Sequence, residues 1–389
     1  MKKVLVVLLS ILCLFTLSAC GNDSAASSDG TVTIKLGSSG PLSGDAKTYG
    51  VAVRNAAQLA VDEINASDSK IKFDFNMQDD EADGEKAVTA YSSLYDWGMQ
   101  VSLLTVTSGS GAAVAKNYDE DKIFGITPSG SSTALVYTDS ENFEGNFQMC
   151  FTDPNQGVAS ADYIAANFKD AKIAIIYKSD DVYSTGVYEK FMSQAKNNGL
   201  NLVYDSGAFT DDSSTDFSTQ LTAAKDAGAD LVFLPIYYQP ASIILKQASD
   251  MSYAPKFFGI DGMDGILTLE GFDTSLAEGV YLLTPFAADA TDDATVHFVS
   301  AYNAAYGETP NQFAADGYDC VYAIHQALEN IGIDADYNFD NLYTDMIAQF
   351  TSMTFDGITG TSVTWATNGE VSKAPKAVII QNGVYVSAD

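Results

Sequence analysis

Three loops rich in serine and glycine are candidate binding elements. Each follows a predicted strand, and together they read Ser38-Ser39-Gly40-Pro41-Leu42-Ser43-Gly44, Thr107-Ser108-Gly109-Ser110-Gly111 and Pro128-Ser129-Gly130-Ser131-Ser132. Two of them open helices or turns, where backbone N–H groups without an intrahelical partner favour an anion. Serine hydroxyls add uncharged donors, and this combination suits a carboxylate. Serine and glycine also cap helices and form turns, but three such loops at one expected sheet edge favour a binding site.

The second half of the chain supplies different groups after its strands, namely Asp180-Asp181-Val182-Tyr183, Pro235-Ile236-Tyr237-Tyr238 and Gly259-Ile260-Asp261-Gly262. A tyrosine offers a flat apolar wall with a hydroxyl at its rim, and Asp261 is placed to pair with an ammonium group. Packing and helix capping are the alternative roles of these side chains. The first half of the chain thus offers hydrogen-bond donors for a ligand carboxylate, and the second half offers an acid. If the two halves form lobes that face each other, they would recognise a zwitterion, and an α-amino acid is the simplest one.

Groups suited to catalysis are scarce. His297 and His325 lie in predicted helices without a serine nucleophile motif, and the chain has neither a Gly-x-Ser-x-Gly elbow nor a P-loop. An acidic run over 334–345 is a poor calcium loop, because Phe339 stands where the sharp turn needs glycine. Arg54 is the only arginine, which argues against phosphorylated or dicarboxylate ligands. We therefore expect a binding protein that is not an enzyme and that holds no cofactor and no metal.

Alternating strands and helices must position these loops. The first part of the chain has predicted strands at 31–37, 71–75, 101–106 and 122–126 and predicted helices at 51–64, at 84–97 and from Ser108. In the first helix one face carries Val53, Ala56, Ala57, Ala60, Val61 and Ile64. This order predicts a parallel sheet with helices on both faces. Ligands of such sheets lie beyond the carboxyl ends of the strands, where the loops are.

The pattern then restarts. Helices at 156–168, 182–198, 217–227 and 241–249 alternate with strands at 171–176, 202–204, 231–234, 257–260 and 280–283. Three more helices are predicted at about 292–306, 313–331 and 339–350, followed by a strand-rich tail in which Asn382-Gly383 is typical of a type I′ hairpin.

The predicted fold class is α/β, with two doubly wound Rossmann-like lobes joined by a multi-strand hinge. Lobe 1 is expected to comprise residues 31–152 plus 284–356, and lobe 2 residues 153–283 plus 357–389. The helical block followed by a strand tail implies that the chain crosses between the lobes more than once.

The N-terminus predicts export. Residues 1–19 resemble a secretory signal peptide, with Lys2 and Lys3 before an apolar run too short to span a membrane. The run ends in Leu17-Ser18-Ala19-Cys20-Gly21, which resembles a bacterial lipobox and predicts cleavage before Cys20 and a lipid on its thiol. An ordinary signal peptide with an incidental cysteine is the alternative. Residues 20–30 are expected to form a flexible tether to the cell membrane.

The net charge of the chain limits the partners that are expected. The 389 residues include 20 Lys and Arg against 51 Asp and Glu, a net charge of −31. Such a chain is repelled by phosphate backbones, so we expect no nucleic acid partner.

Beyond Cys20 only Cys150 and Cys320 remain after signal removal. They could pair, although two buried free thiols are the favoured interpretation.

Six motifs in order along the chain resemble a known family. They are GSSGPLSGDAKTYGVAVRNAAQLAVDEINA at 37–66, TSGSGAAVAKNYDEDKIFGITPSGSS at 107–132, DDVYSTG at 180–186, STDFSTQL at 214–221, LPIYYQPASIILKQA at 234–248 and FFGIDG at 257–262. Together they resemble the type I periplasmic binding proteins of ABC transporters, in the leucine/isoleucine/valine-binding branch. The resemblance covers residues 31–389 and implies a two-lobed clamp with a three-stranded hinge.

The resemblance also implies roles for individual residues. Ser108 would bind a ligand α-carboxylate through its hydroxyl and backbone N–H, the Ser129 carbonyl would accept from the α-ammonium, and Ser131 would hold the ligand's backbone end. Tyr183 and Asp261 would close from the second lobe, with Asp261 on the ammonium. Tyr49 and Tyr237 would line the side-chain pocket. Ala82 and Thr107 stand where family members carry a disulfide, so that bond is not expected here.

We therefore expect a monomeric, extracytoplasmic, lipid-anchored solute-binding protein. It would capture an amino acid, branched-chain or similarly small or aromatic, and deliver it to an ABC transporter permease. Two alternatives stay open: the same fold could bind another small metabolite such as an amide or aromatic acid, or it could serve as a sensor subunit for a signalling partner.

Overall fold

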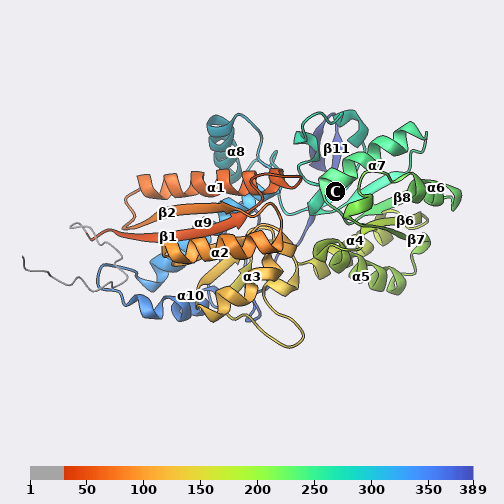
Figure 1. The fold of residues 1–389 in the computed structure, drawn as a ribbon. Helices are drawn as coiled ribbons and strands as arrows, with labels where there is room; N and C mark the ends of the chain where they lie inside the picture. Colours follow the sequence, from red (N-terminus) through yellow and green to blue (C-terminus); the bar gives the residue numbers. More distant parts are fainter. Residues whose placement is uncertain (1–29, 389) are drawn as a thin grey trace, which may run out of the picture.

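The computed structural model describes residues 30–388 and shows two α/β lobes side by side (Figure 1). The first lobe is built on a fully parallel sheet. Its strands, in spatial order, are β2 (Ile71–Asp79), β1 (Val32–Gly40), β3 (Val101–Thr105), β4 (Phe124–Thr127) and β5 (Asn146–Gln148). The predicted signal peptide, Cys20 and the tether up to residue 29 lie outside the described residues.

The second lobe is built on a larger, mixed sheet. Its strands, in spatial order, are β12 (Val384–Ser387), β11 (Lys376–Gln381), β10 (Tyr281–Thr284), β9 (Lys256–Gly259), β8 (Leu231–Leu234), β6 (Lys172–Lys178) and β7 (Asn201–Phe209). The pairs from β7 to β10 are parallel, whereas β11 pairs antiparallel with β10 and with β12. The predicted hairpin is confirmed, because Asn382 and Gly383 have φ of 54° and 75°, as a type I′ turn requires.

Helices cover the faces of both sheets. The first lobe carries α1 (Lys47–Ala66), α2 (Gly84–Trp97), α3 (Ser108–Glu120), α8 (Asp293–Tyr306), α9 (Gln312–Ile331) and α10 (Leu342–Phe350). The second carries α4 (Asp153–Asn167), α5 (Val182–Asn197), α6 (Ser218–Asp226) and α7 (Tyr238–Asp250). The α/β fold class with two lobes is therefore confirmed. The sequence prediction missed β5, which has three residues and no apolar alternation.

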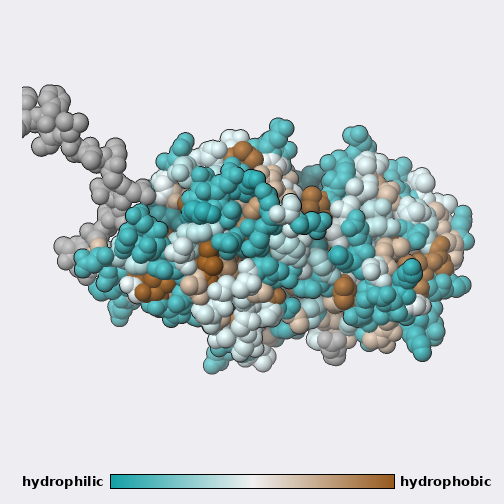
Figure 2. Space-filling model, turned by 90° about the horizontal axis from the view of Figure 1, so that it is seen from below, coloured by the Kyte–Doolittle hydropathy of each residue, from teal (hydrophilic) through white to brown (hydrophobic). Residues whose placement is uncertain are grey.

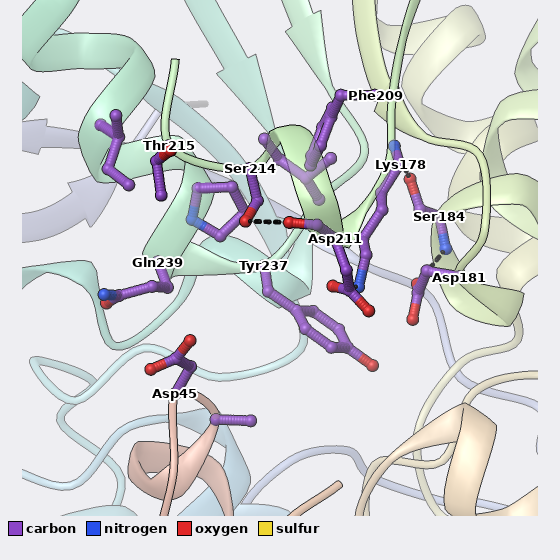
Figure 3. A pocket seen from close by; sticks show the side chains of 14 residues that line it. Asp45, Lys178, Asp181, Ser184, Phe209, Asp211, Ser214, Thr215, Tyr237 and Gln239 are labelled. Carbon is purple, nitrogen blue, oxygen red and sulfur yellow. Dashed lines mark hydrogen bonds and ion pairs between the residues drawn. The ribbon is translucent and has the colours of Figure 1, made fainter. Parts of the chain in front are cut away.

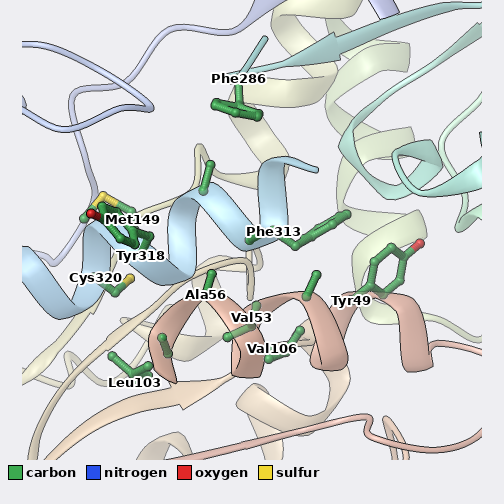
Figure 4. Close-up of a cluster of buried hydrophobic side chains, with 14 of the residues drawn as sticks. Tyr49, Val53, Ala56, Leu103, Val106, Met149, Phe286, Phe313, Tyr318 and Cys320 are labelled. Carbon is green, nitrogen blue, oxygen red and sulfur yellow. The ribbon is translucent and has the colours of Figure 1, made fainter. Parts of the chain in front are cut away.

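The first lobe's core lies between α1 and α9. The predicted apolar stripe of α1 is buried, with Val53, Ala56 and Ala60 fully shielded from solvent. Figure 4 shows this stripe facing α9, whose Phe313 ring lies opposite Tyr49. Their ring centroids are 4.4 Å apart. The packing of these two helices fixes the start of α1, and with it the position of Tyr49 at the interlobe cleft.

The chain passes between the lobes three times, over 149–152, 285–292 and 351–375. Most of the last connection packs on the first lobe: the Trp365 ring contacts Phe350 at 4.8 Å, and Trp365 Nε1 donates to the Gln148 carbonyl at 2.8 Å. The exact residue at which each lobe begins and ends stays a prediction. Cys150, in the first connection, and Cys320 are both buried free thiols.

The face of the molecule shown in Figure 2 is mostly hydrophilic, with small, separate apolar spots. Among residues 30–388 the exposed large apolar side chains are scattered along the chain: Val88, Tyr95, Val158, Val182, Val296 and Val384. No helix in that range has the length and apolar content needed to cross a membrane.

A buried ion pair joins the third connection to α9. Lys373 Nζ lies 2.8 Å from Asp316 Oδ1, and both side chains are 2% exposed. Lys373 also donates to Thr359 Oγ1 at 2.6 Å, and the Thr359 hydroxyl donates to Asp319. Removing the cation would leave the buried Asp316 carboxylate without its charged partner.

We predict that Lys373→Met lowers the free energy of unfolding by about 3 kcal/mol, because an unpaired buried charge keeps its desolvation cost. Urea denaturation of the purified chain measures this. Lys376→Met is the matched control, since Lys376 is an exposed lysine at the start of β11 and should change stability by less than about 0.5 kcal/mol. Equal effects of the two variants would contradict the assignment.

Candidate functional site

One narrow cavity between the lobes collects every ligand-binding residue predicted from the sequence. Its lining comprises Tyr49, Val106, Thr107, Ser108, Ser129, Ser131, Tyr183, Tyr237, Asp261, Gly262 and Phe313. Its volume of about 10 Å³ is room for about one water molecule. The two lobes are therefore closed on each other, and a larger molecule can enter only if they separate.

The first lobe contributes the start of α3. Thr107 has the extended backbone of an N-cap residue, so Ser108 begins the helix and the N–H groups of its first turn lack intrahelical acceptors. The Ser108 hydroxyl accepts from Ser132 N at 3.1 Å, which links this helix start to the loop after β4. Thr107 lines the cavity, and its hydroxyl is buried without a partner among the described residues. This edge of the site therefore presents donors toward the cavity.

The loop after β4 is held from both sides. Gln148 Nε2 donates to the carbonyls of Gly130 and Ser132 at 2.9 and 3.0 Å. The Ser129 hydroxyl donates to the Val106 carbonyl at 2.6 Å, and the Ser131 carbonyl accepts from Asp153 N at 2.9 Å. The serine positions are thus fixed before any ligand arrives.

Asp80 supports the first loop from behind. It is fully buried, and it accepts from the Ser39 hydroxyl at 3.0 Å and from Ala82 N at 2.9 Å. Burial raises its pKa to about 6, although these hydrogen bonds oppose the rise. Its neighbour Asp79 accepts from Leu42 N at 2.9 Å and so holds the same loop on the solvent side.

The second lobe contributes a buried carboxyl group. Asp261 directly follows β9 and Ile260; its Oδ1 accepts from the Tyr183 hydroxyl at 2.5 Å and its Oδ2 from Gln156 Nε2 at 2.8 Å. The Tyr183 oxygen in turn accepts from Gly262 N at 2.9 Å. Burial raises the Asp261 pKa to about 7, partly offset by these hydrogen bonds. The group is therefore poised between its neutral and charged forms near neutral pH.

Aromatic rings complete the cavity and bridge the lobes. The Tyr49 hydroxyl donates to the Gly262 carbonyl of the other lobe at 2.5 Å and accepts from Tyr238 N at 3.2 Å. The Tyr237 ring stacks on Tyr183, with centroids 5.1 Å apart, and meets Tyr49 edge-on at 5.2 Å. The aromatic wall predicted from the sequence is therefore assembled from both lobes.

Sequence reasoning missed Gln156 and Asp153. Both lie in the first turn of α4, which the prediction began at 156 and the structure begins at Asp153. Thr152 caps this helix by accepting from Asn155 N at 3.3 Å, and Pro154 lies in its first turn, so a Thr-x-Pro signal was present. Asp153 is buried with one oxygen unpartnered among residues 30–388, and burial raises its pKa well above the usual range.

The acidic side chains around the cavity are not matched by basic ones in its described lining. No lysine or arginine is among its lining residues in the described chain. Burial and then the charges of Asp181, Asp153, Asp261 and Asp80 raise the pKa of the Tyr237 hydroxyl well above its usual value. The site as a whole therefore favours a group that carries positive charge.

Comparison with known proteins agrees with this architecture. The family model described as "Periplasmic binding protein" matches residues 33–382. The chain belongs to the periplasmic binding protein family. The resemblance drawn from the six motifs to type I members of this family is confirmed.

Individual members of the family extend the comparison. The Leu/Ile/Val-binding protein BraC3 of Rhizobium johnstonii is 26% identical over 301 residues, which cover 77% of this chain and 80% of the relative. LivJ of Streptococcus pneumoniae, solved in complex with isoleucine, is 25% identical with a TM-score of 0.78, covering 91% of this chain and 99% of that one. A solute-binding protein of R. palustris, solved with benzoate, shares the fold at 18% identity and a TM-score of 0.81, covering 92% and 95%.

The two histidines make their contacts elsewhere in the first lobe. Within residues 30–388 no three His, Cys, Asp or Glu side chains are grouped to bind an ion. His297 Nε2 lies 3.1 Å from Glu63 and His325 Nε2 lies 2.9 Å from Ser69. Neither histidine lines the cavity of this periplasmic binding protein.

We predict that Asp261→Asn changes the pH dependence of stability. An acid whose pKa is raised by folding binds protons more tightly in the folded state, so its contribution to stability is lost as pH rises. From the ordinary pKa near 4 to about 7, the wild type should therefore lose about 2–4 kcal/mol relative to Asp261→Asn. Above about pH 7 the difference should be constant.

Urea denaturation at several pH values between 4 and 8 measures this difference. Asp226→Asn is the control, because Asp226 is an exposed residue of α6 and should follow the wild-type curve. Parallel curves for wild type and Asp261→Asn would show that this carboxyl has an ordinary pKa.

Proposed function

We propose that this protein is an extracytoplasmic solute-binding protein that captures an α-amino acid between its lobes and delivers it to an ABC transporter permease. One observation carries the proposal: Asp261 of the second lobe and the start of α3 in the first lobe line the same cavity. A carboxylate acceptor opposite free N–H and hydroxyl donors matches the two charged ends of an amino acid.

Each cavity residue has a role in this proposal. The Ser108 hydroxyl and backbone N–H bind the α-carboxylate, Ser131 holds the same end, and the Ser129 carbonyl accepts from the ammonium. Asp261, oriented by Tyr183, pairs with the ammonium from the other lobe. Tyr49 and Tyr237 line the space for the side chain, which is branched-chain or similarly small or aromatic. BraC3 and LivJ, which are named for or solved with such amino acids, support this class.

The charge of the cavity favours an amino acid over the alternative ligands. A neutral amide would leave the Asp261 charge uncompensated when it ionises, and an aromatic acid would meet a negative site with no cation in its lining. The benzoate-bound R. palustris protein shows only that the shared fold can hold such an acid elsewhere.

Capture requires the lobes to open and close. In the closed arrangement Tyr49 bonds Gly262, the Tyr238 hydroxyl bonds the Asp45 carbonyl at 2.6 Å, and Gln312 N bonds Asp264 at 3.0 Å. A ligand that contacts both lobes adds to these bonds and shifts the equilibrium toward closure. The permease then reads the closed form. A sensor subunit would use the same motion, with a signalling partner in place of the permease.

The proposal includes export and anchoring. The signal peptide over 1–19 and the lipid on Cys20 would hold a monomer at the outer side of the bacterial cell membrane through the tether. The family match supports an extracytoplasmic location.

We predict that Ser108→Ala and Asp261→Asn each weaken amino-acid binding by about tenfold or more, because each leaves a charged ligand group short of a buried partner. The ligand is first found by a thermal-shift screen of the lipid-free chain from residue 21 against the common amino acids, since ligands of the folded state raise the melting temperature. Calorimetry then measures the affinity of each variant.

Two exposed positions supply controls. Ser193→Ala and Asp226→Asn change the same residue types on the outer faces of α5 and α6 and should bind like the wild type. Wild-type affinity in both site variants would refute the assignment of Ser108 and Asp261.

We also predict that affinity falls about tenfold per pH unit below about pH 7, because Asp261 must lose its proton before it can pair with an ammonium. Above that pH the affinity should level off, and Asp261→Asn should abolish the dependence. Calorimetric titrations between pH 5 and 8 test this. A ligand that is only a carboxylic acid would show the opposite trend, with tighter binding at low pH.

A further inference from the structure

Gln312 joins the first lobe to the segment of the second lobe that carries Asp261. It is the first residue of α9, the helix that packs on α1 in the core of the first lobe, and it is 2% exposed. Gln312 does not line the cavity at Asp261, so any effect that it has on a ligand there must pass through other residues. Its hydrogen bonds run to two separate parts of the second lobe.

Three hydrogen bonds make up this junction. Gln312 Nε2 donates to the Asp261 carbonyl at 3.0 Å, and Gln312 N donates to Asp264 Oδ2 at 3.0 Å. Gln312 Oε1 accepts from the Thr284 hydroxyl at 3.0 Å. Thr284 is the last residue of β10 and directly precedes the second connection between the lobes. One residue of the first lobe thus holds both the Asp261 segment and the hinge end of the second sheet.

The bond to Asp264 has an electrostatic component. The first N–H groups of a helix lack intrahelical acceptors and carry a partial positive charge. Asp264 is buried and places its carboxyl group at this end of the 20-residue helix α9. Burial raises the Asp264 pKa, and the bonds from Gln312 N and Gly265 N oppose that rise. The attraction between Asp264 and the helix start therefore favours the arrangement in which the lobes are closed.

We propose that Gln312 is a positioning residue for capture, which fixes the backbone of Asp261 against α9 and favours the closed arrangement of the lobes. The inference rests on the proposed function, in which Asp261 pairs with the ligand. Without the Gln312 amide, the closed form has one donor fewer at the Asp261 carbonyl and one acceptor fewer at the Thr284 hydroxyl, whereas water replaces both partners in the open form. The population then shifts toward the open form, and the apparent affinity falls with the fraction of closed molecules.

The first measurement determines the arrangement of the lobes without any ligand. Spin labels are attached to Ser92→Cys on α2 and Ser193→Cys on α5, which are exposed positions on helices of different lobes. Cys150 and Cys320 are buried and should not react with the label. Double electron–electron resonance on the lipid-free chain from residue 21 then gives the populations of open and closed molecules. Gln312→Met keeps the length of the side chain and should raise the ratio of open to closed molecules at least fivefold.

Gln326→Met is the matched control. Gln326 lies in the same helix, and its Nε2 donates to the Thr354 carbonyl at 2.9 Å, in the third connection rather than in the Asp261 segment. Its loss should lower the urea midpoint of unfolding and leave the distance distribution as in the wild type. An unchanged distribution in Gln312→Met, an equal shift in both variants, or a wild type that is wholly open would overturn the inference.

A second measurement separates positioning from a general loss of stability. With the amino acid found by the screen, Gln312→Met should bind at least fivefold more weakly in calorimetry, whereas Gln326→Met should bind like the wild type. The pH below which affinity falls should stay at about 7, because Tyr183 and Gln156 still bond the Asp261 carboxyl group. Wild-type affinity in Gln312→Met would overturn the inference. If the wild type binds no amino acid, the proposed function fails, and the distance measurement still decides whether Gln312 holds the lobes closed.

Discussion

The buried carboxyl group of Asp261 is the constraint around which the interlobe cleft is arranged. A carboxylate removed from water needs donors or it takes up a proton. Tyr183 and Gln156 supply two donors at 2.5 and 2.8 Å, yet the pKa still rises to about 7. The two hydrogen bonds do not fully compensate the desolvation of the Asp261 charge, and a ligand ammonium would supply the remaining stabilisation. From Asp261 a chain of hydrogen bonds runs through Tyr183 and Gly262 to Tyr49, which belongs to the first lobe.

Most of the fold could be predicted from the sequence because it follows from local rules, whereas several candidate site residues, such as Tyr49 and Ser131, were given their roles only through the resemblance to the family. The stripe from Val53 to Ile64 fixes a helix, and loops that follow parallel strands must share one edge of the sheet. Gln156 could not be found in this way, because its amide reaches Asp261 from a helix 105 residues earlier in the chain, a contact that only the packing of the second lobe creates. The three-residue strand β5 was missed for a related reason: its pairing with β4, not its own pattern, makes it a strand.

The connections between the lobes contain buried charged and titratable groups. Lys373 ties the third connection to Asp316 of α9, and the charges of Asp316, Asp261 and Lys373 all act on the Cys150 thiol in the first connection after burial has raised its pKa. The hinge and the base of the site therefore share one buried electrostatic environment. The Lys373 ammonium offsets part of the negative charge near the cavity, whose own described lining contains no lysine or arginine.

The cavity at Asp261 depends on closure of the lobes. It is built from both of them, with Ser108 and Ser129 on one side and Asp261 on the other, so it exists only when the lobes meet. A neighbouring cavity of about 170 Å³, drawn in Figure 3, shares Tyr237 with it but is lined almost entirely by the second lobe, with only Asp45 and Ala46 from the first among the described residues. Separation of the lobes therefore removes the small cavity, whereas most of the lining of its neighbour stays in place. The groups proposed to recognise a charged ligand are thus the ones that only closure brings together.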